Sequence, residues 1–217
     1  MKTTIIRLVG LLLFLSVNLF RTLVAQDLPP VLQRVLDVDT TYNKLSCTLE
    51  IELDIPGLNM PNKEVYLELE KDKKPKIKSK GLILIPKRGL IGQYSDLLNV
   101  PSQTILMESK GDTTVYKVVS LDNTTDWVTV DFKVTETDAK IHSQIISTRK
   151  NGVYEISHVY GEDQSVFPEM SMIQFEAMPV KLPLKFIGKS TDTGHLFNDD
   201  GPISGKVYLY YSELKIE

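Results

Sequence analysis

Apolar and acidic side chains alternate through residues 46–55 (SCTLEIELDI), and this period of two constrains the fold more than any other feature of the chain. In an extended strand Leu49, Ile51 and Leu53 lie on one face, while Glu50 and Glu52 lie on the other. The segment therefore predicts a β-strand that has one buried and one solvated face.

The same alternation recurs along most of the chain. Further strands are predicted at residues 64–70, 115–121, 128–134, 140–148, 152–160 and 205–217. Turn-forming pairs separate several of them, and Asn151 with Gly152 is the strongest hairpin signal. We expect about ten antiparallel strands in a meander. Because no long helices alternate with the strands, a doubly wound nucleotide-binding fold is disfavoured.

An amphipathic helix is predicted before the first strand. Residues 28–45 place Leu32, Val35 and Leu36 at helical spacing behind two prolines, which indicates about three turns. Residues 165–179 (SVFPEMSMIQFEAMP) are rich in methionine and offer a further adaptable apolar surface that we expect to cover the sheet.

A short lid is predicted after an apolar strand at residues 82–85. Pro86 ends that strand because it cannot donate to the ladder, and Gly89 permits an unusual turn. Apolar residues then recur at helical spacing, and they include Ile91, Tyr94 and Leu98. We predict a lid at residues 90–98 and a hinge at 86–89. A phosphate-binding loop is excluded because G-x-x-x-x-G-K-[ST] is missing.

These patterns predict a mainly β (α+β) domain built on a single strongly curved antiparallel sheet. A sheet of this many strands must curl, and one early helix cannot cover every apolar side chain on its concave face. The sheet therefore either closes on itself or leaves an apolar surface for a lid or a ligand. No linker or fixed-period repeat interrupts the chain, so we predict one domain spanning residues 27–217.

The first 26 residues have the pattern of an export signal. The basic residues Lys2 and Arg7 precede a mostly apolar stretch, and no acidic residue occurs before Asp27. The apolar stretch is about 13 residues, short of the roughly 20 that a membrane-spanning helix needs. We predict that residues 1–26 are cleaved and that the mature protein is soluble in the periplasm.

The predicted leader holds three of the 25 basic residues, so the mature chain has 22 basic and 28 acidic side chains. An acidic exported domain is a poor candidate for binding nucleic acid, which depends on neutralising phosphates. The lone Cys47 cannot form an internal disulfide, so the fold must depend on its apolar core.

No catalytic or metal-binding motif is recognisable. The chain lacks G-x-S-x-G, C-x-x-C and H-E-x-x-H. His142 and His158 lie within strand patterns among small polar residues, so we interpret them as solvated or edge residues. We predict a protein that is not an enzyme and that uses no metal or cofactor.

The sharpest local charge lies in residues 71–80 (KDKKPKIKSK), which we call the basic prong. One interpretation is contact with an anionic membrane or an acidic partner, and the other is a solvated turn whose charge prevents edge pairing. The lysines that carry this prediction are Lys73, Lys74, Lys76, Lys78 and Lys80.

Taken in order, these segments resemble the outer-membrane lipoprotein carrier (LolA-like) superfamily, in the divergent forms exported by Bacteroidetes-type bacteria. The resemblance rests on the helix VLQRVLDVDTTYNKLS, the strand CTLEIELDI, the segment KGLILIPKRGL and the ending LPLKFIGKS…GKVYLYYSELKI. It implies an incomplete barrel whose open side is covered by helices and encloses a cavity for acyl chains. It also implies transient contact with transport components of the inner or outer membrane. The basic residue that locks the lid in the classical carrier has no assignable counterpart.

We therefore predict a periplasmic carrier or binding protein for a lipoprotein acyl group or another hydrophobic ligand. The alternative is a structural or interaction module of the cell envelope whose core is filled by its own side chains. The predicted cavity residues are Leu49, Ile51, Leu53, Val65, Leu67, Val128, Val130 and Phe132. The predicted lid residues are Leu32, Leu36, Ile91, Tyr94 and Leu98, and the predicted hinge residues are Pro86 and Gly89.

Overall fold

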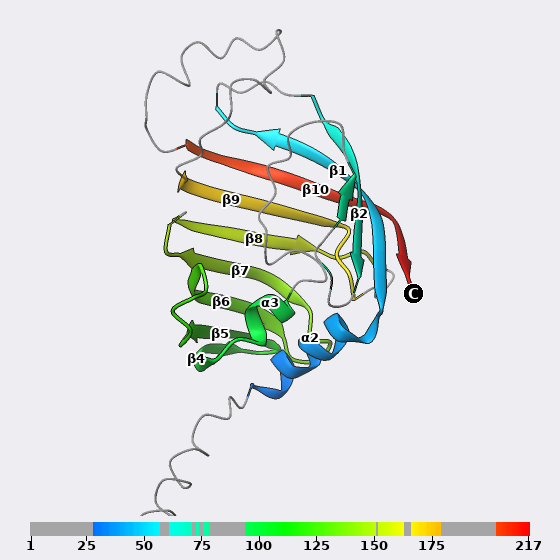
Figure 1. Cartoon of the computed structure of the whole chain (residues 1–217). Helices are drawn as coiled ribbons and strands as arrows, with labels where there is room; N and C mark the ends of the chain where they lie inside the picture. Colours follow the sequence, from blue (N-terminus) through cyan, green and yellow to red (C-terminus); the bar gives the residue numbers. More distant parts are fainter. Residues whose placement is uncertain are drawn as a thin grey trace, which may run out of the picture.

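The computed structural model describes residues 28–56, 61–70, 73, 76–78, 94–150, 152–162, 166–178 and 203–217, which form ten strands and two helices (Figure 1). The helices are α2 (Pro30–Thr41) and α3 (Ser95–Leu98). The strands are β1 (Lys44–Asp54), β2 (Lys63–Glu70), β3 (Lys76–Lys78), β4 (Ser102–Lys110), β5 (Thr113–Ser120), β6 (Trp127–Thr135), β7 (Ile141–Thr148), β8 (Val153–Val159), β9 (Met170–Met178) and β10 (Ile203–Ile216).

All ten strands form one antiparallel sheet in the order β3-β2-β1-β10-β9-β8-β7-β6-β5-β4. The predicted meander is confirmed within β1–β3 and within β4–β10. The two runs are joined where the last strand, β10, pairs with the first, β1. This pairing extends from Leu45 opposite Ile216 to Asp54 opposite Lys206. Among the described residues the sheet does not close on itself, so the prediction of a mainly β incomplete barrel is confirmed.

The apolar positions of the alternating strands face inward. Leu49 pairs with Val65 and Ile51 pairs with Leu209, and all four side chains are buried. On the other face Glu50 lies opposite Glu64, and both are exposed. Partners across an antiparallel ladder share a face, so the register places the apolar set of each strand in one core.

Helix α2 covers part of the inner face as its spacing predicts. It begins with Pro30, whose missing N–H costs nothing at this position, and it buries Val31, Leu32, Val35 and Leu36. Arg34 on its outer side donates to the main-chain oxygens of Glu136 and, at 3.0 Å, Thr137 in the β6–β7 turn. The helix is thereby tied to the half of the sheet that ends at β4.

Helix α3 is a single turn that buries Leu97 and Leu98. The main-chain N–H of Ser95 donates to a carboxylate oxygen of Asp39 in α2 at 2.8 Å. The two helices therefore form one connected cover, which lies on the inner side of the curved sheet (Figure 1).

Two segments differ from their predictions. The methionine-rich segment was expected to cover the sheet, but Met170–Met178 forms β9, an interior strand between β8 and β10. In the basic prong Lys76–Lys78 forms the edge strand β3. In both cases hydrogen bonding to a neighbouring strand decides the structure, and local composition does not reveal that neighbour.

Candidate functional site

The inner face of the sheet under α2 and α3 is the candidate functional site. Six of the predicted cavity residues belong to a single buried core, and Leu53 packs against it. These six are Leu49, Ile51, Val65, Leu67, Val130 and Phe132. The structure therefore brings the predicted set together from β1, β2 and β6.

Val128 is the exception in the predicted cavity set. The register of β6 against β7 shifts between Trp127 and Thr129, so the strand contains a bulge there. Trp127 is 1% exposed and takes the buried position, whereas Val128 is only half-buried. The prediction assumed unbroken alternation, and the bulge exchanges one side chain for the other.

The predicted lid residues divide between the described and undescribed parts of the chain. Leu32, Leu36 and Leu98 are buried in the core, and Tyr94 packs against it. Ile91 and both predicted hinge residues, Pro86 and Gly89, lie outside the described residues.

A small pocket lies where α2 meets the β6–β7 turn and the β8–β9 connection. Its lining includes Val35, Asp39, Tyr94, Tyr160 and Phe167. Its volume is about 20 Å³, which is room for about one water molecule. In this arrangement the pocket is too small for an acyl chain, so a ligand of that size would require the helices to move.

Beyond the helices, the apolar inner face continues to both edges of the sheet. Leu106 of β4 pairs with Tyr116, which pairs with the buried Phe132, so all three lie on the inner face. Leu106 is nevertheless 60% exposed. At the other edge Ile77 of β3 pairs with the buried Leu67 and is 43% exposed. The apolar surface is therefore covered in its middle and accessible at both ends.

A polar cluster crosses this apolar face, and we call it the polar seam. His158 Nδ1 lies 2.7 Å from Ser171 Oγ, and its Nε2 lies 3.3 Å from Tyr94 Oη. Tyr211 donates its hydroxyl to Ser171 Oγ at 3.0 Å. The polar seam thus joins the residue before α3 to strands β8, β9 and β10, and its members are Tyr94, His158, Ser171 and Tyr211.

The interpretation of His158 as a solvated or edge residue was wrong. Its side chain is 6% exposed, and burial lowers its pKa to about 4 because a charged imidazolium loses its hydration. The neighbouring His142 adds to this lowering. His158 is therefore neutral at physiological pH. Only the pairing of β8 with β9, which sets His158 opposite Ser171, reveals its polar partner.

Asp39 is a second buried polar group beside the pocket. It accepts hydrogen bonds from the Tyr42 hydroxyl at 3.1 Å and from the Ser95 main chain. Burial raises the pKa of Asp39 above its usual range, and these hydrogen bonds oppose the rise. Asp39 accounts for part of the cohesion between α2 and α3.

Cys47 is buried in the core and forms no disulfide. Burial raises the pKa of its thiol to about 11, so the reactive thiolate is scarce at neutral pH. We regard Cys47 as a packing residue.

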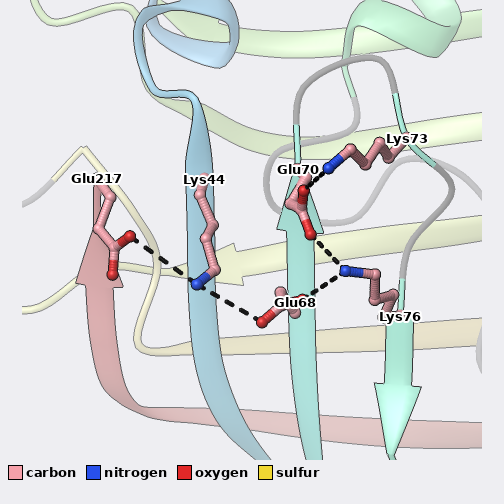
Figure 2. Close-up of polar contacts among 6 residues, drawn as sticks. All are labelled: Lys44, Glu68, Glu70, Lys73, Lys76 and Glu217. Carbon is pink, nitrogen blue, oxygen red and sulfur yellow. Dashed lines mark hydrogen bonds and ion pairs between the residues drawn. The ribbon is translucent and has the colours of Figure 1, made fainter.

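The lysines of the basic prong that the structure describes are engaged locally, and Figure 2 shows Lys73 and Lys76. Lys76 pairs with Glu68 at 2.9 Å and with Glu70, and Lys73 also pairs with Glu70. Lys78 lies over the ring of Tyr66, 5.4 Å from its centre. Lys74 and Lys80 lie outside the described residues.

These ion pairs reduce the net positive charge that the basic prong presents. Hydrogen bonds from Lys73 and Lys76 lower the pKa of Glu70 to about 2, so its charge persists at any physiological pH. Lys44 of β1 also pairs with Glu68, at 3.6 Å (Figure 2). Glutamates of β2 thus offset much of the described positive charge, which favours the interpretation as a protected sheet edge.

In the described part of the chain, no three His, Cys, Asp or Glu side chains gather as metal ligands would. Neither of the two described helices is long and apolar enough to cross a membrane.

No family model matches the sequence, and no curated protein matches it. Solved structures do match the fold. A LolA superfamily protein from Nitrosomonas europaea aligns with a TM-score of 0.52 at 10% identity, covering 86% of this chain and 92% of that one. An outer-membrane lipoprotein-sorting protein domain from Vibrio parahaemolyticus aligns with the same TM-score and identity, covering 86% and 91%. The curved sheet with its helical cover is therefore a fold that this chain shares with these two proteins.

Proposed function

We propose that this protein is a periplasmic carrier or binding protein for the acyl group of a lipoprotein or for another hydrophobic ligand. The observation that carries the proposal is the apolar inner face of the sheet, which is covered by α2 and α3 in the middle and exposed at Leu106 and Ile77. An apolar surface that extends beyond its cover is typical of a ligand-binding groove.

The likeness of the fold to LolA superfamily proteins supports the same proposal. The driving force would be the transfer of an acyl chain from water to the inner face, worth roughly 0.8 kcal/mol for each buried methylene group. No chemical step is required, and release would follow when the helical cover moves at a target membrane.

Lipid extraction and native mass spectrometry of protein purified from the periplasm test whether a ligand is carried. Uptake of the uncharged apolar dye N-phenyl-1-naphthylamine gives a second readout. We expect a co-purifying lipid and saturable dye uptake. The absence of both would overturn the carrier proposal.

Two neighbouring substitutions locate the binding surface. Leu106→Arg places a charge on the inner face, whereas Ile105→Arg places the same charge on the outer face of the same strand. Both positions are exposed, at 60% and 41%, so both variants should fold. We expect dye uptake to fall several-fold in Leu106→Arg and to stay unchanged in Ile105→Arg. Equal uptake by the two variants would contradict binding at this end of the inner face.

A further inference from the structure

Apolar side chains of the inner face flank the polar seam on β8, β9 and β10. Ile156 precedes His158 by two residues on β8, and Ile173 follows Ser171 by two residues on β9, so each pair shares a face. Leu209 of β10 lies directly opposite Ser171. These three apolar side chains are at most 1% exposed. A ligand at the polar seam would therefore present a polar group within a mainly hydrophobic molecule.

The hydrogen bonds of the polar seam leave one donor unused. With His158 neutral, each of the four side chains carries one polar hydrogen, but only three hydrogen bonds join them. No other side-chain hydrogen bond within the described part of the chain engages the hydroxyl of Ser171 or Tyr94. One donor is therefore available for an acceptor that the described residues do not supply.

Either tautomer of His158 leads to the same result. If Nδ1 carries the proton it donates to Ser171, Tyr94 donates to Nε2, and the hydrogen of Ser171 is left over. If Nε2 carries the proton it donates to Tyr94, Ser171 donates to Nδ1, and the hydrogen of Tyr94 is left over. The unused donor is always a hydroxyl on the inner face, and a buried donor without an acceptor is costly.

Charge limits which acceptor fits. Lys140 lies 5.1 Å from the centre of the Tyr160 ring and 3.7 Å from a carboxylate oxygen of Asp138, and it makes no contact with the polar seam. His158 is itself neutral because burial lowers its pKa to about 4. Among the described residues no lysine or arginine contacts the polar seam, so a carboxylate would lose its hydration without gaining a counter-charge from them, whereas an uncharged carbonyl oxygen needs only a donor.

We propose that the polar seam is a subsite for the carbonyl oxygen of an acyl ester or amide, with the donor supplied by the hydroxyl of Ser171 or Tyr94. This inference rests on the proposed function and narrows its ligand class to uncharged acyl compounds. Tyr94 directly precedes α3, so the subsite connects the ligand to the helical cover.

The test compares two lipids that differ at one carbonyl group. A saturated 1-monoacylglycerol carries an ester, and the 1-O-alkylglycerol of equal chain length lacks the carbonyl oxygen. Dissociation constants are measured by displacement of N-phenyl-1-naphthylamine. We expect the wild-type protein to prefer the ester about three- to tenfold, as one hydrogen bond allows. The free fatty acid of equal length should bind more weakly than the ester at pH 7.5.

Variants identify the donor. Ser171→Ala and Tyr94→Phe each remove one hydroxyl, and the preference should disappear in the variant that loses the unused donor. Thr114→Val is the matched control, because Thr114 is a buried hydroxyl residue on the inner face that makes no contact with the polar seam. If Ser171→Ala does not fold, the wild-type protein can be tested with an ester labelled with ¹³C at its carbonyl. In the ¹³C NMR spectrum a hydrogen bond moves the carbonyl resonance downfield.

The outcomes separate the two proposals. Equal binding of the two glycerolipids by the wild-type protein would overturn the subsite and leave the carrier proposal intact. The subsite would also be overturned if the preference survives in both hydroxyl variants, or if the free acid binds as tightly as the ester. Failure of both glycerolipids to bind would overturn the subsite, and the carrier proposal falls with it only if no lipid co-purifies and no dye is taken up.

Discussion

Strand β3 ends the sheet with three residues, whereas β4 ends it with nine. At the β3 edge Lys76 and Lys78 engage Glu68 and Tyr66 on the outer face, so charge opposes pairing with another strand. At the β4 edge Ile105, Leu106 and Met107 are all at least 41% exposed. The difference indicates that the β3 edge is protected, while the β4 edge gives access to the apolar inner face.

The largest difference in the free energy of unfolding should appear between the buried core and the β4 edge. Leu49→Ala removes a fully buried side chain and should lower the free energy of unfolding by about 2–5 kcal/mol. Leu106→Ala should change it by less than about 0.5 kcal/mol, because that side chain is mostly exposed. Urea denaturation measures both. A large loss in Leu106→Ala would show that the β4 edge is packed rather than open.

Between the two edges, the polar seam should make stability depend on pH. Below pH 6.5 the unfolded chain protonates His158, but the folded protein does not until about pH 4. The free energy of unfolding should therefore fall as the pH drops through this window, by roughly 3 kcal/mol.

The variant His158→Gln keeps a polar side chain but cannot titrate. Urea denaturation of both proteins at pH 7 and pH 4.5 isolates the histidine, because the carboxylates contribute to both. Equal losses in the two proteins would show that His158 is solvated after all.

A smaller effect should come from the contact between α2 and the β6–β7 turn, which lies in the half of the sheet that ends at β4. Arg34→Met should lower the free energy of unfolding by about 1 kcal/mol, since Arg34 is exposed and its hydrogen bonds go to main-chain oxygens. Arg34→Lys keeps the charge but cannot donate to both oxygens in the same geometry. If the lysine variant retains full stability, charge rather than hydrogen-bond geometry explains the contact.

The smallest effect on stability should come from a substitution at the β3 edge. Lys76→Gln removes exposed ion pairs to Glu68 and Glu70, which salt screens. We expect a slight loss of thermal stability at low salt that disappears at high salt. The variant should also associate with itself more readily, as light scattering would show, because the edge loses its charge. Unchanged association would contradict the protective role of Lys76.

Features with a local period were predicted correctly from the sequence. The alternation of β1 and β2 identified their buried faces, and helical spacing identified α2 with Leu32 and Leu36 buried. Both patterns depend only on neighbours along the chain, so a single sequence contains the necessary information.

Features that depend on pairing between strands were missed. Strand β4 was not recognised, because a bulge between Leu106 and Glu108 interrupts its alternation and leaves three consecutive apolar residues. Another bulge replaced Val128 with Trp127 on the buried face. A bulge depends on the partner strand, and nothing in its own residues marks it reliably.

The sequence by itself determined that this chain forms a curved antiparallel sheet with an apolar inner face and a helix to cover part of it. Only the tertiary structure decided that β10 lies beside β1, that His158 meets Ser171 and Tyr94 inside the protein, and that the lysines of the basic prong meet glutamates of β2. The reason is physical. Alternation determines which side chains share a face of one strand. The register between strands determines which side chains contact one another, and the candidate site is made of such contacts.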